Sequence, residues 1–273
     1  AMLSRWSVLI VTLEMSERRY GARFLQSFFS LTRREGTAKI PRLIKDKANA
    51  LVDISVDELE RMALMNPDDR AAISRKVRRE FGKRPRIKIK EFPTHSLTMP
   101  QLEAYLEGLE RYEGFVPDLI ILDYPDLMEM DPKNVRAELQ AITARYRGLG
   151  VKRNAAVIAL TQPNREGEKS RLVTGDQAAE DISKLATADT FITYSQTRAE
   201  YKLGLARLFV EKARNEEAKM QILITQAYSV GQFCLDSLLL DSEYWDLLEA
   251  RDPETGGRRS KRRRDADDDE EDA

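Results

Sequence analysis

The sequence predicts an α/β domain built on a mainly parallel β-sheet flanked by helices. Short apolar and β-branched runs alternate with segments of helical periodicity, which is the pattern of strand–helix–strand units. The central runs are apolar without alternation, as expected of strands that are buried on both faces. The late runs follow one another without long helices between them, so we expect an antiparallel edge there.

The expected strands and helices follow from local periodicity. The strands are Val8–Leu13, Ile87–Phe92, Leu119–Leu122, Ala156–Thr161, Thr190–Tyr194, Arg207–Val210 and Met220–Thr225. The helices are Glu17–Leu31, Asp57–Met65, Asp69–Phe81, a segment that opens at Thr98, and Asn134–Arg147. Thr98 can cap its helix, and Pro100 fits the first turn.

The composition excludes several classes of protein. The chain has 273 residues, of which 33% are charged, and a formal net charge of −1. The single cysteine, Cys234, excludes an intramolecular disulfide and is expected in the core. The single histidine, His95, excludes His-rich metal sites. We expect no signal peptide and no membrane partner, because no apolar run approaches the roughly 20 residues of a membrane span.

The near-neutral total hides segregated charge. Arg70–Lys90 holds ten basic residues and one acid, Glu80. This segment suits either an electrostatic contact with nucleic acid or a solvated outer helix. Residues 251–273 join a basic block to an acidic block and hold very few apolar residues, so we expect a disordered tail. We therefore expect a core over residues 1–240, a C-terminal helix over 241–250 and the tail over 251–273.

Polar residues end three of the expected strands: Glu14, Asp123 and Gln162. Ligands of parallel sheets bind beyond the carboxyl ends of the strands. An Asp there can hold Mg²⁺ directly or through water, and a Glu can activate an attacking water. A Gln can respond to a γ-phosphate. Each residue alone can simply mark where a strand reaches the surface, but the three together favour a site for phosphate chemistry.

Lys212 and Arg214 are two residues apart near the end of the expected strand Arg207–Val210, and in a strand residues two apart point to the same face. Two cations there can reach a phosphate on a neighbouring subunit, as an arginine finger does. The alternative is a solvated edge strand in which Glu211 and Glu216 are their ion-pair partners.

These residues lie in stretches that resemble the motor domain of DnaB-type hexameric replicative helicases, within the RecA-like ATPases. The resemblance is strongest to the T4-type phage helicases. The stretches are VLIVTLEMSERRYGARFLQS, IKEFPTHSLTMPQLEAYL, FVPDLIILDYPDLM, ALTQPNR, LATADTFITYSQT and VEKARNEEAKMQI, within residues 6–236. The resemblance implies a RecA-like sheet, ATP and Mg²⁺ as cofactors, and ATP hydrolysis coupled to DNA unwinding.

The resemblance also implies roles for individual residues. Glu14 would be the catalytic glutamate, and Asp123 the Walker B aspartate that acts through water-bound Mg²⁺, with Tyr124 beside it in the cofactor site. Gln162 would couple the γ-phosphate to a DNA-facing loop. Arg214, with Lys212, would be the finger that reaches the next subunit's nucleotide.

The loop after Gln162 would face the central channel of the ring. Its cations Arg165, Lys169 and Arg171 would contact DNA phosphates, although the loop can also be an ordinary polar connection. The stretch GDQAAEDISK has no arginine where this family often has one, and Lys184 is the available substitute. The implied partners are single-stranded DNA, sister subunits in a hexamer, a primase and a helicase loader, in a bacterial or phage-infected cytoplasm.

The sequence departs from the family at the P-loop. The phosphate-binding pattern G-x-x-x-x-G-K-[ST] is absent, and the chain begins at the strand that follows the P-loop in the family. We therefore expect the isolated chain to bind ATP weakly and to hydrolyse it slowly or not at all, unless a missing segment or a second chain supplies a P-loop. The alternatives are a non-hydrolysing RecA-like scaffold or binding subunit, and another RecA-like ATPase such as a recombinase or a KaiC-like protein.

Overall fold

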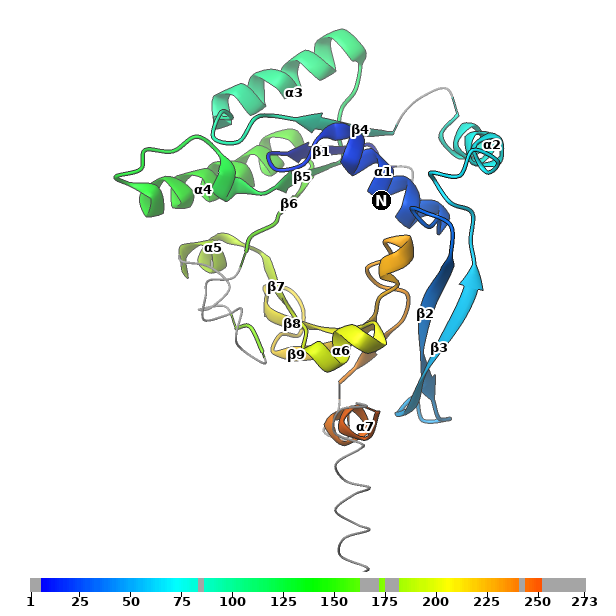
Figure 1. The fold of residues 1–273 in the computed structure, drawn as a ribbon. Helices are drawn as coiled ribbons and strands as arrows, with labels where there is room; N and C mark the ends of the chain where they lie inside the picture. The colour runs from blue at the N-terminus through cyan, green and yellow to red at the C-terminus, as the bar shows by residue number, and fades with distance from the viewer. Residues whose placement is uncertain (1–5, 83–85, 163–171, 175–181, 241–243, 252–273) are drawn as a thin grey trace, which may run out of the picture.

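The computed structural model describes residues 6–82, 86–162, 172–174, 182–240 and 244–251. The described residues form two four-stranded sheets and a two-stranded hairpin. Figure 1 shows the first sheet with its helices at the top, the second sheet below it, and the hairpin along one side. The expected α/β fold with a helix-flanked parallel sheet is confirmed. Residues 252–273 of the expected tail lie outside the described residues.

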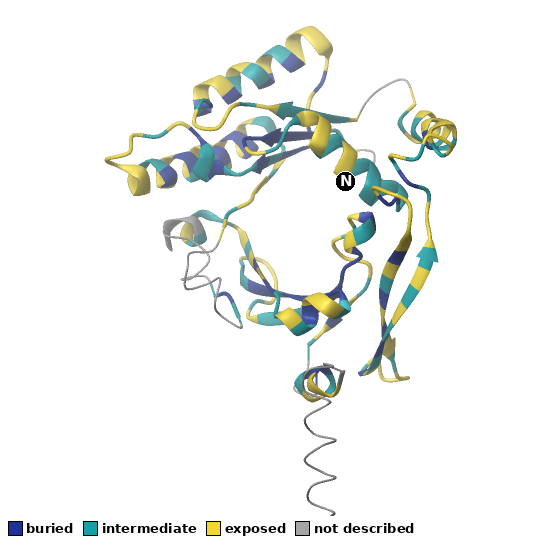
Figure 2. Cartoon of the chain, viewed as in Figure 1, coloured by how far each residue is buried: buried dark blue, intermediate teal, exposed yellow. Residues whose placement is uncertain are grey.

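The first sheet is parallel throughout, with the order β4-β1-β5-β6. Its strands are β1 (Val8–Thr12), β4 (Ile87–Glu91), β5 (Leu119–Asp123) and β6 (Ala156–Ala159). Apolar residues of β1 and β5 are almost fully buried, as Figure 2 shows in dark blue. This burial agrees with the unbroken apolar runs in the sequence.

Helices α3 (Met99–Glu113) and α4 (Val135–Arg153) cover one face of this sheet. α3 begins with the expected Thr98 cap, which forms a reciprocal capping box with Gln101. Beneath α4, the buried Tyr146 hydroxyl donates hydrogen bonds to the carbonyl oxygens of Ile120 (2.8 Å) and Ile158 (3.2 Å). This hydroxyl ties α4 to both β5 and β6, and its burial raises the pKa of Tyr146 far above the usual value.

The opposite face is covered only in part, by α1 (Glu17–Phe29). α1 begins at Ser16, whose side chain accepts a hydrogen bond from the Arg19 backbone N–H. Tyr20 of α1 packs against Val8 and Ile10 of β1. No described helix covers the same face over β6, where Ile158 is 45% exposed.

The helix expected over Asp57–Met65 is wrong, because its first four residues belong to a β-hairpin and the others are not helical. β2 (Thr37–Lys45) and β3 (Leu51–Glu60) pair antiparallel along their length. Val52, Ile54 and Val56 alternate with polar residues, which is the period of a strand. The pairing and this alternation prevail over the helical preference of the acidic run DELE. Downstream, α2 (Arg70–Phe81) forms close to the expected Asp69–Phe81.

The second sheet is antiparallel, with the order β10-β9-β8-β7. Its strands are β7 (Thr190–Ser195), β8 (Leu205–Ala213), β9 (Met220–Thr225) and β10 (Ser237–Leu239). Around them lie three short helices: α5 (Ile182–Thr187), α6 (Arg198–Leu203) and α7 (Tyr244–Arg251). The expected antiparallel arrangement of the late strands is confirmed, but they form a sheet of their own instead of an edge of the first.

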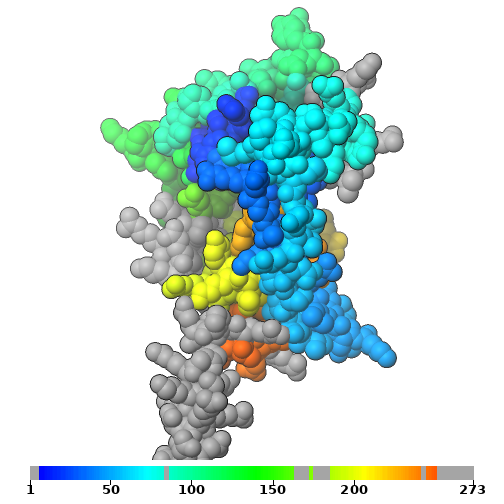
Figure 3. All heavy atoms as spheres, turned by 45° about the vertical axis from the view of Figure 1, so that its right-hand side comes forward, coloured from blue at the N-terminus to red at the C-terminus, as the bar shows by residue number. Residues whose placement is uncertain are grey.

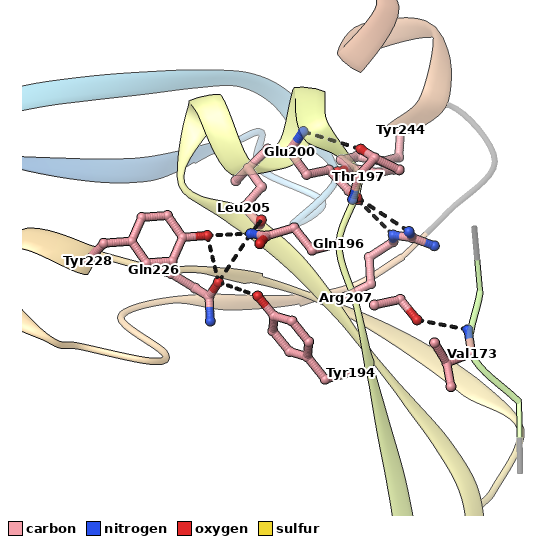
Figure 4. Close-up of polar contacts among 11 residues, drawn as sticks. Val173, Tyr194, Gln196, Thr197, Glu200, Leu205, Arg207, Gln226, Tyr228 and Tyr244 are labelled. Atoms are coloured by element: carbon pink, nitrogen blue, oxygen red, sulfur yellow. Dashed lines mark hydrogen bonds and ion pairs between the residues drawn. The ribbon is translucent and has the colours of Figure 1, made fainter. Parts of the chain in front are cut away.

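A buried ion pair organises this second sheet (Figure 4). Glu200 of α6 and Arg207 of β8 are 0% and 1% exposed, and Arg207 Nε lies 2.6 Å from Glu200 Oε1. The Tyr244 hydroxyl donates to the same carboxylate at 2.8 Å. The Arg207 guanidinium also lies over the Trp245 ring, 4.7 Å from its centroid. The pair therefore fixes α7 to the sheet.

The hairpin and neighbouring loops join the two sheets. Leu43, Leu51 and Ile54 of the hairpin share a core with residues of the second sheet and α7. Lys45 Nζ lies 2.9 Å from Asp236 Oδ1, beside β10. Figure 3 shows the hairpin, in blue to cyan, running down one side of the molecule. Gln232, in the connection after β9, donates a hydrogen bond to the Ser27 carbonyl oxygen of α1 at 3.1 Å, so the second sheet is also held to the helix of the first.

Two further observations bear on the expectations from sequence. Cys234 is exposed, so its expected place in the core is wrong. It lies in the short connection between β9 and β10, among exposed neighbours such as Phe233 and Leu235. None of the helices in the described ranges combines the length and the apolar character that crossing a membrane requires.

Candidate functional site

The two candidate carboxylates lie at the same end of neighbouring strands. In the β1–β5 register Thr12 is opposite Asp123, and the backbone N–H of Leu13 donates to the Asp123 carbonyl oxygen at 2.9 Å. Glu14 follows Leu13 directly and is exposed, whereas Asp123 is half-buried. The structure therefore brings Glu14 and Asp123 together at the carboxyl end of the parallel sheet.

The environment of Asp123 disfavours its charged form. Burial raises the pKa of the Asp123 carboxyl, the negative charge of Glu14 raises it further, and the Arg23 guanidinium opposes both. A divalent cation would offset the cost of keeping this carboxylate charged. The residues thus fit Mg²⁺ held by Asp123, directly or through water. Within the described ranges, no three or more His, Cys, Asp or Glu side chains gather as a ready-made metal cage.

Tyr124 and Gln162 lie at the same edge of the sheet. Tyr124 follows Asp123 through a cis peptide bond, and its pKa is raised first by burial and then by Glu14. A short 3-10 turn, η1 (Pro125–Leu127), carries Asp126, whose carboxylate accepts a hydrogen bond from the Thr161 hydroxyl at 3.4 Å. Gln162 is the exposed residue after Thr161. This contact links the ends of β5 and β6.

An apolar cavity opens beside the carboxylates. It has a volume of about 460 Å³ and is lined by Val8, Ile10, Tyr20, Phe24, Ile121 and Asp123, among others. Its walls come from the face of the first sheet that α1 covers only in part. Asp123 contributes the acidic group of this otherwise largely apolar lining. Burial raises the pKa of Tyr20, and the charge of Asp123 raises it further.

The two candidate finger residues lie close together at the end of β8. Lys212 Nζ donates to the carbonyl oxygens of Leu185 (2.8 Å) and Ala186 (2.9 Å) in α5. Arg214 forms an ion pair with Asp189 at 2.8 Å. Asp189 is also held by Arg147 at 3.0 Å. The hydrogen bond from Arg147, followed by the charges of Arg147, Arg214 and Lys212, holds the pKa of Asp189 below its usual value.

These cations are not among the charged groups that act on Asp123. The charges that shift the pKa of Asp123 are those of Glu14 and Arg23. Lys212 and Arg214 contact α5 and Asp189 instead, and the ion pair of Asp189 with Arg147 links them to α4. The structure therefore does not bring Arg214 to the carboxylates of its own chain.

The proposed DNA contacts are largely outside the described residues. Arg165, Lys169 and Arg171 fall in the range 163–171, of which the structure describes nothing. Lys184 belongs to α5, and its side chain is not described. The backbone of α5 does receive the hydrogen bonds from Lys212.

The structure reveals a polar and aromatic cluster that the sequence reasoning missed (Figure 4). The Gln226 side-chain oxygen accepts hydrogen bonds from the hydroxyls of Tyr194 (2.9 Å) and Tyr228 (3.0 Å). The Gln196 amide nitrogen donates to the same oxygen at 3.3 Å. The Tyr201 ring stacks on Tyr228 at 4.9 Å, and both rings are exposed.

This cluster lies at the ends of β7 and β9. Gln196 and Gln226 each directly follow the last residue of a strand, which is the signal that identified Gln162. The same rule, applied to the expected strand Met220–Thr225, would have found Gln226, whereas the expected strand Thr190–Tyr194 ends one residue too early to indicate Gln196. Exposed, hydrogen-bonded rings of this kind offer a flat surface on which a planar base can stack.

Comparison with known proteins identifies the fold. No protein-family model matches the sequence, and neither does any curated protein. One solved ATPase domain matches 88% of this chain and 76% of its own length, with a TM-score of 0.62 and 14% identity. A DnaB-like replicative helicase, solved in a study of its interactions with primase, matches 85% of this chain with a TM-score of 0.60 and 15% identity. This chain covers 51% of that second protein, about half its length. The chain therefore has the fold of the ATPase domains of DnaB-type helicases.

Proposed function

We propose that the chain is the motor-domain portion of a replicative DNA helicase, which couples ATP hydrolysis to translocation on single-stranded DNA and duplex unwinding. One observation carries the proposal. Glu14 and Asp123 lie together at the carboxyl end of a sheet with the fold of a helicase ATPase domain. This is the position at which α/β sheets bind nucleotides.

In this proposal the two carboxylates have different tasks. Glu14 is exposed and not held by the sheet, so it can accept a proton from the water that attacks the γ-phosphate. Asp123 is half-buried and holds Mg²⁺ through water, with Tyr124 beside it. When bound there, Mg²⁺ would neutralise negative charge on the phosphates of ATP. Gln162 passes the state of the γ-phosphate to the loop that follows it.

Lys212 and Arg214 act on the nucleotide of a neighbouring subunit. Their contacts with α5 and Asp189, and not with the carboxylates of their own chain, support this assignment, because a finger that acts in trans serves the nucleotide of the neighbouring subunit. Arg214 would leave its exposed pair with Asp189 to reach the neighbour. The active assembly is then a ring, and we propose a hexamer.

The remaining partners follow from the same proposal. The loop cations Arg165, Lys169 and Arg171, with Lys184, contact DNA phosphates in the channel. A primase and a helicase loader bind elsewhere on the ring, in a bacterial or phage-infected cytoplasm. The similar DnaB-like helicase was solved in a study of its interactions with primase, which supports the primase assignment.

ATP binding also needs a phosphate loop, which a missing segment or a second polypeptide can supply. The sequence holds no G-x-x-x-x-G-K-[ST] pattern, and this observation favours a second candidate, a RecA-like scaffold or binding subunit that does not hydrolyse ATP. Other RecA-like ATPases, such as a recombinase or a KaiC-like protein, use the same fold. The carboxylates distinguish the candidates, because a scaffold does not depend on Glu14.

Mixed rings test the proposal, in the assembly that includes a phosphate loop. Glu14→Gln and Arg214→Ala should each lower ATP turnover by about 10³-fold or more in uniform rings. When the two variants are mixed, random assembly pairs an intact Glu14 with a neighbour's intact Arg214 at about a quarter of the interfaces, so activity should partly return. Mixed rings that stay inactive would contradict action in trans. Uniform Glu14→Gln rings with full activity would contradict the catalytic role of Glu14, and wild-type rings without ATP turnover would support the scaffold.

A further inference from the structure

Helix α2 packs on the molecule through a single apolar stripe. Ile73 is 7% exposed, and Val77 and Phe81 follow it at intervals of four residues, so the three lie along one side of the helix. The Phe81 ring packs against Phe24 and Phe28 of α1, with ring centroids 5.8 and 5.4 Å apart. The opposite side of α2 therefore carries its exposed residues.

That outer side is a basic surface. Arg75, Arg78 and Arg79 are three and four residues apart, so they lie side by side, and all three are exposed. Like charges at this spacing repel one another and disfavour the helix. Within the described residues Arg79 pairs with Glu80 at 2.9 Å, whereas Arg75 and Arg78 have no carboxylate partner. These three residues, the α2 arginines, thus have the charge to hold an anionic group.

Other cations around the first sheet are neutralised by carboxylates of the described chain. Three ion pairs join cations of β4 and α4 to α3: Lys88–Glu113, Lys152–Glu103 and Arg153–Glu110. The α2 arginines differ from these cations, because α2 contains five basic residues and one acid. Such an excess of one sign on one helix attracts a ligand of the opposite charge.

The chain itself contains a segment of the matching charge. Seven of the eight residues 265–272 are acidic, and the eighth is Ala266. These residues lie outside the described ranges. A carboxylate can accept two parallel hydrogen bonds from an arginine guanidinium. This acidic run can therefore neutralise the α2 arginines and relieve their mutual repulsion.

The basic residues 258–264 compete with α2 for the acidic run. They directly precede it in the sequence. Pairing these two runs would have to fix the conformation of both, at a cost in conformational entropy. The α2 arginines stand on a helix that is already packed, so docking there fixes one run alone. The helix is therefore the better partner.

The acidic run can reach α2 from the end of α7. Figure 1 shows α7 and α2 near opposite ends of the hairpin, whose core α7 shares. The Ala63 backbone N–H donates to the Asp69 carboxylate at 2.7 Å, which fixes the start of α2 to the segment after the hairpin. With a nine-residue strand of about 30 Å, Arg75 lies on the order of 40 Å from α7. The chain from Arg251 to Asp265 can span up to about 50 Å.

Nucleic acid is the other polyanion that the α2 arginines could bind. α2 leads into β4, which is one edge of the first sheet. The loop proposed to contact DNA follows β6, which is the other edge. Two strands, β1 and β5, separate these edges. The position of α2 therefore favours the acidic run over DNA.

We propose that residues 265–272 dock on the α2 arginines of the same chain. The carboxylates pair with the guanidinium groups on the outer side of α2, while the apolar stripe stays packed on α1. An anionic partner must displace the acidic run before it can bind this side of α2. The contact thus controls access to the basic surface.

A spin label on the acidic run tests this contact in the full chain. Ala266→Cys places a nitroxide there without removing a charge, in a Cys234→Ser background because Cys234 is exposed and would also react. The label should broaden the amide NMR signals of α2, including those of Arg75 and Arg79, independently of protein concentration. The broadening should disappear in about 1 M salt, where the Debye length is about 3 Å.

Matched variants make the test specific. Arg75→Glu combined with Arg79→Glu should lower the docking constant at least about tenfold, because it turns ion pairs into repulsions. Lys133→Glu combined with Arg145→Glu is the control, since both cations are exposed, just before and within α4, on the other side of the molecule in Figure 1. It changes the net charge equally and should change the docking constant less than about twofold, because distant charges are screened.

The inference would be overturned by α2 signals that the label leaves sharp, by broadening that survives Arg75→Glu with Arg79→Glu, or by equal loss in both variants. Spin-labelled chains mixed with isotope-labelled chains distinguish a second copy: broadening between chains would refute docking within one chain. A tenfold loss of single-strand DNA affinity in Arg75→Glu with Arg79→Glu, measured by fluorescence anisotropy, would assign the surface to nucleic acid and refute the proposed occupant, since about tenfold is the loss expected at a docking surface.

Discussion

Removing the Glu200 carboxylate is the substitution whose effect on stability the structure predicts most sharply. Glu200 is fully buried and binds Arg207, the Tyr244 hydroxyl and the Thr197 backbone N–H, the last at 2.6 Å. Glu200→Ala leaves the Arg207 guanidinium buried without its carboxylate. Breaking a buried pair in this way costs about 3–5 kcal/mol. At about 2–4 °C per kcal/mol for a chain of this size, Tm should fall by roughly 6–20 °C.

Urea and thermal unfolding measure this loss of stability, and two control variants test whether it comes from the buried charge. Arg42→Ala breaks the Arg42–Asp57 pair, whose side chains are 63% and 42% exposed, so it should cost no more than about 1 kcal/mol. Replacing both Glu200 and Arg207 by leucine removes both buried charges and should recover most of the loss. A Glu200→Ala variant destabilised by less than about 1 kcal/mol would refute the view that this pair holds α6, β8 and α7 together.

Three further predictions concern the carboxylate site, the first sheet and the basic helix. The pKa of Asp123 is raised in the folded chain, so the stability gained from its protonation is present at low pH and is lost as the pH rises through that pKa. Asp123→Asn should therefore unfold at a higher temperature than the wild type at pH 7. In calorimetry this difference should vanish at about pH 3. Tyr146→Phe removes the hydroxyl that bonds β5 and β6, and should cost about 1 kcal/mol in urea unfolding; an unchanged midpoint would refute that role. Reversing the charge of Arg75, Lys76, Arg78 and Arg79 on α2 should leave single-strand DNA affinity largely unchanged in fluorescence anisotropy, and a large loss would assign the basic segment to DNA binding.

The parallel sheet and its carboxylates could be predicted from the sequence, because buried parallel strands leave an unbroken apolar signal. The runs around Val8–Thr12 and Leu119–Asp123 need no partner to be recognised. The residue after each run is then placed by the strand itself. For this reason Glu14 and Asp123 lie together at the carboxyl ends of β1 and β5, as the sequence predicts.

The hairpin and the environment of Cys234 could not be predicted as well, because both depend on long-range contacts. Residues 57–60 prefer a helix locally, and only their pairing with β2 makes them a strand. Cys234 lies between two apolar residues, but the connection that carries it is on the surface. The split of the described strands into two sheets depends on which strands pair, and periodicity does not specify pairing.

The most direct test of the account is ATP turnover by the chain in three states, each with single-stranded DNA and Mg²⁺. The chain alone should turn over far more slowly than about 1 s⁻¹, a typical enzymatic rate. Addition of a polypeptide that supplies a phosphate loop should produce DNA-stimulated hydrolysis. The same mixture made with Glu14→Gln should lose that activity. Rapid turnover by the chain alone, or a reconstituted activity that survives Glu14→Gln, would contradict the account.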